Sequence, residues 1–347
     1  MNRKEPKIVY FEILRLIAIF GVLFCHTGRS GIHHYLETDN GFNYWFGIFA
    51  VSVAQYCIPL FFMITGALLL KRQESISYVL RHRVLRIVCV IVLAALLQYL
   101  WRLRGEPGLG FDRKLYFRMV YEGSAAGQHW FLYAYLSFLL ILPFLQRLVK
   151  AIPARSWFIY LFVIWEIIYG LFPIIEYYQE WRSTPLELSM FGDAVLYSML
   201  GYFVECCTED FFYKGKNVFW TSIIVSLLVA GTMYMNHTTL SAGHYAAYGS
   251  ALAPVFSFLI YITVRYICCH WRCPVILEKG FRFAGGGVFG VYLMEGPLRE
   301  TFYFIYLALN TRIYSYPAVF VWIFTCIVTG ILITNLLKKV PVIGKLL

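Results

Sequence analysis

The stretch Ile8–His26, which reads IVYFEILRLIAIFGVLFCH, decides the class of fold. A helix needs roughly 20 mostly apolar residues to cross the hydrocarbon core of a bilayer, and this stretch is about that long. It exceeds the apolar region of a cleaved signal peptide, which reaches roughly 15 residues, and it contains Glu12 and Arg15. Because runs of similar length recur along the chain, we expect an all-α protein that crosses the membrane several times.

The composition of the whole chain agrees with this fold class. Of the 347 residues, 60% are hydrophobic and 14% are charged, whereas an ordinary soluble domain has about 25% charged residues. These values exclude a soluble globular enzyme, a disordered chain and a disulfide scaffold, and the unbroken apolar runs argue against an outer-membrane barrel. The net charge of +11 comes from short basic clusters between the runs. We therefore expect a lipid bilayer and no nucleic acid as a partner.

The apolar runs predict about ten transmembrane helices in a single membrane domain that covers residues 1–347. Glu166, Asp193 and several tyrosines interrupt the fifth and sixth runs. The expected helices cover residues 8–27, 44–70, 82–101, 129–149, 156–173, 190–206, 217–236, 246–268, 284–305 and 315–337.

The distribution of lysine and arginine predicts that both termini are cytoplasmic. With that orientation, 20 of the 30 basic residues fall on inside segments and 9 on outside segments, as the positive-inside rule requires. One segment does not follow the rule, because the loop 102–128, which is expected outside, carries five basic residues. Either this loop faces an anionic acceptor, or a span near it is miscounted.

Charged side chains within the first expected helix need an explanation, because each costs about 2.5–3.5 kcal/mol to insert. Glu12 and Arg15 are three residues apart and can pair on one helix face. Arg15 and His26 fall within about 20° of one face and roughly 16 Å apart along the axis. The pattern is explained either by an ion pair that helps the helices to pack, with a histidine at the interface, or by a functional cleft that both residues line at different depths.

Several short motifs, taken in their order along the chain, resemble the membrane acyltransferase 3 family. In the first helix, an acidic residue precedes an arginine, which ten intervening residues separate from a histidine; here these are Glu12, Arg15 and His26. The further matches are the basic run Arg81-His82-Arg83-Val84-Leu85-Arg86-Ile87, His129-Trp130-Phe131-Leu132-Tyr133, Leu200-Gly201-Tyr202-Phe203 and Phe289-Gly290-Val291-Tyr292-Leu293. The resemblance covers nearly the whole chain. One departure is that Met294 and Glu295 follow the last motif, where many relatives have a histidine two residues on.

The resemblance implies an acyltransferase that moves an acyl group, most often acetyl from acetyl-CoA, to a hydroxyl or amine of an envelope glycan or lipid-linked sugar. Acetyl-CoA is then a co-substrate, and we expect no bound cofactor. Family habit places the protein in a bacterial cytoplasmic membrane. The alternative from another functional class is a transporter of a glycan or lipid, since a polar path through ten helices suits that role as well.

The candidate catalytic residues are His26, as the general base or alternatively as the acyl acceptor, and Glu295. Glu295 either orients His26 or His129, or is simply satisfied by neighbouring hydroxyls. The expected orientation places His26, His129 and Glu295 at the same outer level. The candidates for binding acyl-CoA or substrate are Arg15, His129, Trp130, Arg83 and Arg86. For the last four, an aromatic belt or a positive-inside anchor is the alternative. Glu12 has a structural role, as the ion-pair partner of Arg15.

Three further patterns carry no chemistry. Cys268, Cys269, His270 and Cys273 lack the paired spacing of a zinc site, so we expect no metal. Cys25 and His26 diverge by about 100° on a helix, which excludes a dyad. The glycine run 285–287 follows no strand and therefore predicts close helix packing, not a phosphate loop.

Overall fold

The computed structural model describes residues 9–38, 41–105, 110–152, 154–179, 192–241, 252–271, 273–311 and 314–347, and these residues form helices with no strand among them. The helices are α1 (Val9–Cys25), α2 (Phe42–Val53), α3 (Cys57–Leu69), α4 (Ile76–Tyr78), α5 (Leu85–Gly105), α6 (Arg113–Glu122), α7 (Trp130–Ala151), α8 (Arg155–Glu166), α9 (Phe172–Gln179), α10 (Asp193–Cys206), α11 (Glu209–Phe212), α12 (Gly215–Ser241), α13 (Ala253–His270), α14 (Val275–Asn310), α15 (Ser315–Leu337) and α16 (Pro341–Leu346). The all-α prediction is confirmed.

Seven helical segments of the described part are long and apolar enough to cross a membrane. They are Phe42–Leu69, Ile76–Gly105, Gly127–Ala151, Arg155–Ile175, Gly215–Thr239, Ala253–His270 and Ser315–Leu337. Each of the ten expected runs overlaps a described helix, although residues 190–191 and 246–251 lie outside the described residues. The chain is thus a multi-pass helical membrane protein, while the count of ten and the side of both termini stay predictions.

Three helices fail the criteria for a span for reasons that the sequence explains. The described α1 has 17 residues and α10 has 14, which is short for a bilayer. Helix α14 is long enough at 36 residues, but its middle contains the glycine run, Glu295 and Pro297, which lower its apolarity. On its N-terminal side, α14 begins at Val275, before the expected 284–305, and Glu278 and Arg282 pair in this added part at 2.6 Å, four residues apart.

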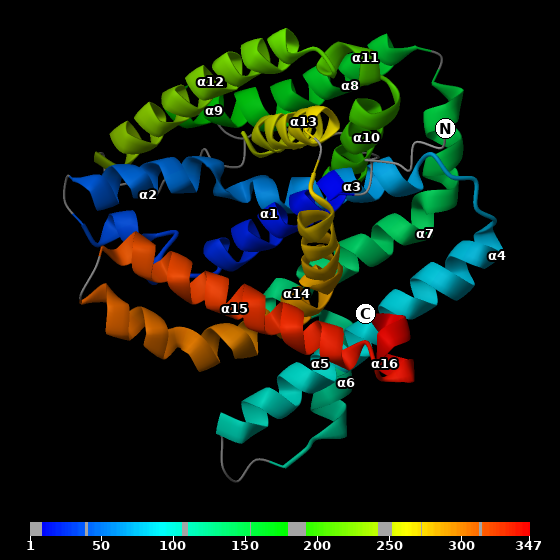
Figure 1. The fold of residues 1–347 in the computed structure, drawn as a ribbon, viewed down its shortest axis with the longest axis vertical. Coiled ribbons are helices and arrows are strands. Elements are labelled where there is room, and N and C mark those ends of the chain that lie inside the picture. Colours follow the sequence, from blue (N-terminus) through cyan, green and yellow to red (C-terminus); the bar gives the residue numbers. More distant parts are fainter. Residues whose placement is uncertain are drawn as a thin grey trace.

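Helix α1 lies in the interior of the bundle, in contact with α3, α13, α14 and α15 (Figure 1). Leu14, Ala18, Ile19 and Leu23 are completely buried along it. This central place explains how α1 carries two charges, since its polar side chains face other helices and a cavity instead of lipid.

The glycine run of α14 allows close helix packing, as its sequence context predicts. A Cβ on Gly285 would lie 2.2 Å from Oε2 of Glu12 on α1, and one on Gly287 would lie 3.1 Å from the Cα of Ile331 on α15. The missing side chains let α14 approach both neighbours.

The basic loop 102–128 contains the short amphipathic helix α6. Its ten residues are too few to span a bilayer, and Tyr116 and Met119 pack against Tyr99 at the end of α5. The five basic residues therefore accompany a helix that lies beside the end of a span. Which side of the membrane they face stays a prediction.

Helices α3 and α10 touch backbone to backbone. A Cβ on Gly66 would come within 1.8 Å of the Ser198 carbonyl oxygen, and one on Gly201 within 1.9 Å of the Met63 carbonyl oxygen. Backbone atoms cannot move aside as a flexible side chain can, so any larger residue forces the two helices apart. This contact holds one wall of the cavity described below.

We expect Gly201→Val to separate α3 from α10 and to cost about 1–3 kcal/mol of folding free energy or more, as overpacking of a tight interface does. Fluorescence-detected gel filtration of detergent extracts measures the folded, monodisperse fraction. The matched control is Gly231→Val on α12, where an added Cβ would meet nothing within 4 Å. Equal monodisperse fractions for both variants would show that the α3–α10 contact is not tight.

Candidate functional site

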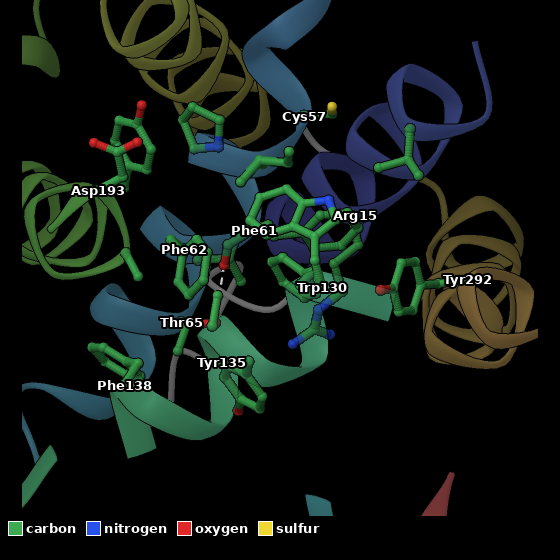
Figure 2. Close-up of a pocket in the computed structure, with 18 of the residues that line it drawn as sticks. Arg15, Cys57, Phe61, Phe62, Thr65, Trp130, Tyr135, Phe138, Asp193 and Tyr292 are labelled. Atoms are coloured by element: carbon green, nitrogen blue, oxygen red, sulfur yellow. Dashed lines mark hydrogen bonds between the residues drawn. The ribbon is translucent and has the colours of Figure 1, made fainter. Parts of the chain in front are cut away.

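A cavity of about 1210 Å³ opens between α1, α3, α7, α10 and α14. Arg15 and His26 both line it, so the two residues of α1 that share a face also share a cavity. Figure 2 shows Tyr292 of α14 across the cavity from Asp193 of α10, with Arg15 and Trp130 between them in this view. The volume is that of a site for a ligand of drug size or larger.

His26, directly after α1, lines one end of the cavity, and Glu295 of α14 contacts it from outside the lining. The Nδ1 atom of His26 lies 2.7 Å from Oε1 of Glu295. The Glu295 side chain is completely buried, while the His26 side chain is 32% exposed. The distance is that of an ion pair. Neither of these two atoms makes a hydrogen bond among the described residues, so the contact lacks hydrogen-bond geometry.

The backbone at His26 is held by Arg299, one helical turn after Glu295. The Nη1 atom of Arg299 donates a hydrogen bond of 2.5 Å to the His26 carbonyl oxygen, and Trp322 donates through Nε1 to the Arg299 carbonyl oxygen at 3.2 Å. Helix α14 thus contacts both the ring and the main chain of His26. This double contact places the ring beside Glu295.

A second link joins α14 to the segment before α7. The Tyr292 hydroxyl donates to the Gln128 carbonyl oxygen at 2.5 Å, and Gln128 lines the cavity. Gly296 leaves room for this segment, because a Cβ there would lie 3.0 Å from the Gln128 side-chain nitrogen. The motif that contains Tyr292 therefore positions the cavity wall.

The opposite end of the cavity is positively charged. Arg15 pairs with Glu12 at 2.6 Å, as its spacing predicts, and its side chain remains 31% exposed. Arg86 also lines this end, where it donates to the Leu346 carbonyl oxygen at 3.1 and 3.2 Å. Burial, followed by the nearby Arg86 charge, lowers the pKa of Lys338, although Glu12 acts in the opposite sense. A cluster of cations at one end of a cavity attracts an anionic ligand.

The structure separates the remaining predicted binding residues into two groups. Trp130 and Arg86 line the cavity, whereas His129 and Arg83 do not. His129 is 3% exposed and ends the short 3-10 turn Gly127–His129 that precedes α7. Arg83 makes two hydrogen bonds of 2.6 and 2.5 Å to Glu74 and lowers the pKa of that carboxyl group. This geometry favours the anchor interpretation for Arg83.

Sequence reasoning overlooked Arg299, Gln128 and Asp193. Arg299 gave a usable signal, because it is a second charge four residues after Glu295 on a helix expected to be apolar. Asp193 appeared only as an interruption of a span, yet it lines the cavity. Gln128 gave no signal, since an uncharged residue before a helix is unremarkable. Among the described residues, no three His, Cys, Asp or Glu side chains group together to hold a metal ion.

Comparison with models of known protein families matches residues 8–336 to the acyltransferase domain of acyltransferase family 3. The match covers nearly the whole chain and includes Arg15, His26, Arg86, Trp130 and Tyr292 of the cavity lining. The searches of curated proteins and of solved structures each return no match.

Proposed function

The chain belongs to acyltransferase family 3, and from that premise we propose that its cavity transfers an acetyl group from acetyl-CoA to a glycan or lipid-linked sugar with His26 as the general base. The observation that carries this proposal is the 2.7 Å contact between His26 Nδ1 and the buried Glu295 carboxylate. It occupies one ring nitrogen and leaves Nε2 for the substrate. A buried carboxylate that orients a histidine in this manner recurs in unrelated acyl-transfer sites.

In the proposed reaction, His26 both accepts the proton from the acceptor and returns it to the leaving sulfur. Nε2 of His26 takes the proton from an acceptor hydroxyl or amine as the oxygen or nitrogen attacks the thioester carbon. The carbon–sulfur bond breaks, and the leaving CoA sulfur receives the proton from the imidazolium. The Glu295 carboxylate stabilises the imidazolium between these two steps. Glu295 contacts His26 and is therefore a positioning residue.

The cationic end of the cavity suits the donor, because CoA is anionic. Arg15 and Arg86 provide guanidinium groups there, and a guanidinium forms charge-assisted hydrogen bonds with phosphate. His26 and Arg15 are roughly 16 Å apart along the helix, so a donor bound at Arg15 would have to extend along the cavity to His26. Its pantetheine arm has the extended shape for this path. The expected orientation, with both termini inside, places the cations on the cytoplasmic side and His26 on the outer side of a bacterial cytoplasmic membrane.

We expect Arg15→Gln to raise the KM for acetyl-CoA by about tenfold or more, because a hydrogen bond to a charged group contributes about 1.5–3 kcal/mol. Steady-state kinetics in membranes measure the change. Arg282→Gln is the matched control, since Arg282 also pairs with a nearby glutamate but lies outside the cavity lining. An unchanged KM in Arg15→Gln would remove Arg15 from donor binding.

The transporter alternative differs in what happens to the donor. Membranes that contain the wild-type protein are given acetyl-labelled CoA and a crude envelope glycan fraction, and both released CoA and glycan-bound label are measured. An acyltransferase fixes label covalently in proportion to released CoA. A carrier would move glycan without consuming acetyl-CoA, and this result would overturn the proposed function.

A further inference from the structure

Part of the cavity wall is formed by a narrow stripe of α7 that is also exposed at the surface of the bundle. Trp130, Ala134, Ser137 and Ile141 all line the cavity. Their spacing of four, three and four residues places them within about 60° of one another around the helix. Trp130 is 48% exposed and Ile141 is 40% exposed, and Ser137 is exposed as well. Along this face, therefore, the cavity is open to the surroundings of the bundle.

A matching stripe lies on α3. Ile58, Phe61, Thr65 and Leu68 line the same cavity, and each of them is half-buried. The one hydroxyl among them is satisfied internally, because Thr65 Oγ1 donates to the Phe61 carbonyl oxygen at 2.9 Å. Figure 2 shows Phe62 and Thr65 of α3 near Tyr135 and Phe138 of α7. We call the space between the two stripes the lateral slot.

The base of the lateral slot is aromatic. The Phe131 ring lies 5.1 Å from Phe62 and 5.8 Å from Phe61, and the Phe138 ring lies 6.3 Å from Phe62. These rings join α3 to α7 and leave an apolar trough on their outer side. A trough of this kind offers dispersion contacts and almost no hydrogen bonds, which suits a hydrocarbon chain and not a sugar.

The length of the lateral slot matches one leaflet of a bilayer. Ile141 is eleven positions after Trp130, which corresponds to roughly 16 Å along a helix, and half of a hydrocarbon core is about 15 Å. Trp130 stands at the end of the span Gly127–Ala151, and Ile141 stands near its middle. The stripe therefore runs from the membrane interface to the bilayer centre, where lipid chains are the available occupant.

We propose that the lateral slot holds the hydrocarbon chain of a lipid-linked acceptor, which enters sideways from the bilayer and presents its sugar to His26. The presentation to His26 rests on the proposed function, whereas the chain site rests on the two stripes alone. The interfacial end of the slot is the end of α7 that Gln128 and Tyr292 tie to α14, near Glu295. The acyl donor fits the slot less well than the acceptor does. Its anionic portion would bind at the cationic end of the cavity, and an acetyl group has no hydrocarbon chain for the slot to hold.

The test uses a dodecyl glucoside that carries a diazirine in its chain, with purified protein in phosphatidylcholine nanodiscs. After illumination, mass spectrometry locates the adducts. We expect them on residues 58–68 of α3 and 130–141 of α7, and we expect unlabelled dodecyl glucoside, but not glucose, to displace them. Ile141→Trp and Ser137→Trp, which fill the opening, should each reduce this labelling by about tenfold.

Leu140→Trp is the matched control, because Leu140 is 51% exposed on the same helix but does not line the cavity. It should label as the wild type does. Adducts spread over all exposed faces and insensitive to Ile141→Trp would overturn the proposal, as would exclusive labelling by a diazirine-bearing palmitoyl-CoA. Labelling is also measured in His26→Ala, where it should persist. If the wild-type protein shows slot labelling but no acyl transfer, the proposed function is contradicted while the chain site still stands.

Discussion

We expect His26→Ala to lower the rate of acyl transfer by about 10³-fold, within the range of 10²–10⁴ that a positioned general base contributes. The side chain lines the cavity and is partly exposed, so its loss removes the proton acceptor without opening a hole in the packed core. Its main-chain carbonyl remains as the acceptor for Arg299. Transfer of label from acetyl-CoA, at equal amounts of folded protein, measures the effect.

His34→Ala is the control for this substitution. His34 follows α1 closely, and its ring packs edge-on against Tyr316 at 5.7 Å, but it does not line the cavity. Its removal should leave the transfer rate within about twofold of the wild type, a range that corresponds to less than about 0.5 kcal/mol. Wild-type activity in His26→Ala would end the proposal that His26 is the base.

The second large effect is expected for Glu295→Gln, which should lower kcat by about 10²–10³-fold and leave the KM for acetyl-CoA unchanged. The amide has nearly the shape of the carboxylate, but it cannot stabilise an imidazolium by charge, and its N–H group can hold the ring in the wrong tautomer. Because Glu295 is completely buried and far from the cationic end, donor binding should not change. Steady-state kinetics separate the two parameters.

A purely structural role for Glu295 predicts a different pattern. Loss of packing would reduce the amount of folded protein, which gel filtration measures independently of turnover. Glu295→Asp, which keeps the charge and shortens the side chain, should recover part of kcat if charge is what matters. A Glu295→Gln enzyme with kcat within twofold of the wild type would contradict the positioning role.

Much of the fold was predictable because apolar run length sets where membrane helices lie. The ends were less predictable, since α14 begins at Val275, before the apolar run, in a turn where Glu278 and Arg282 form an ion pair. Helix α6 was not recognised as a helix because Asp112, which caps it through bonds to the Lys114 and Leu115 nitrogens, precedes a polar segment inside a basic loop.

The candidate site was predictable where one helix carries both residues. Helical geometry alone places Arg15 and His26 on one face, and both line the cavity. Contacts between helices depend on how each helix is rotated about its axis, which a single sequence does not reveal. For that reason the choice of His26 over His129 as the neighbour of Glu295, and the Arg299 contact, emerged only from the folded structure.

Arg83 and Arg86 illustrate the same limit. They are three residues apart in one basic run, yet Glu74 in the preceding turn binds Arg83 and leaves Arg86 to line the cavity. The conformation of that turn depends on Gln146 of α7, whose Oε1 accepts from the Glu74 nitrogen at 3.0 Å and whose Nε2 donates to the Leu69 carbonyl oxygen at 3.0 Å. Such a contact between distant segments leaves no local pattern in the sequence.

The most direct test of the account compares wild-type and His26→Ala membranes side by side with acetyl-labelled CoA and a crude envelope glycan and lipid fraction. Both proteins are first shown to be folded and equally abundant, and released CoA and covalently fixed label are then followed over time. The account predicts equal release of CoA and fixation of label by the wild type, with both falling about 10³-fold in His26→Ala. Equal label transfer by the two proteins, or no transfer by a folded wild type with any acyl-CoA, would contradict it.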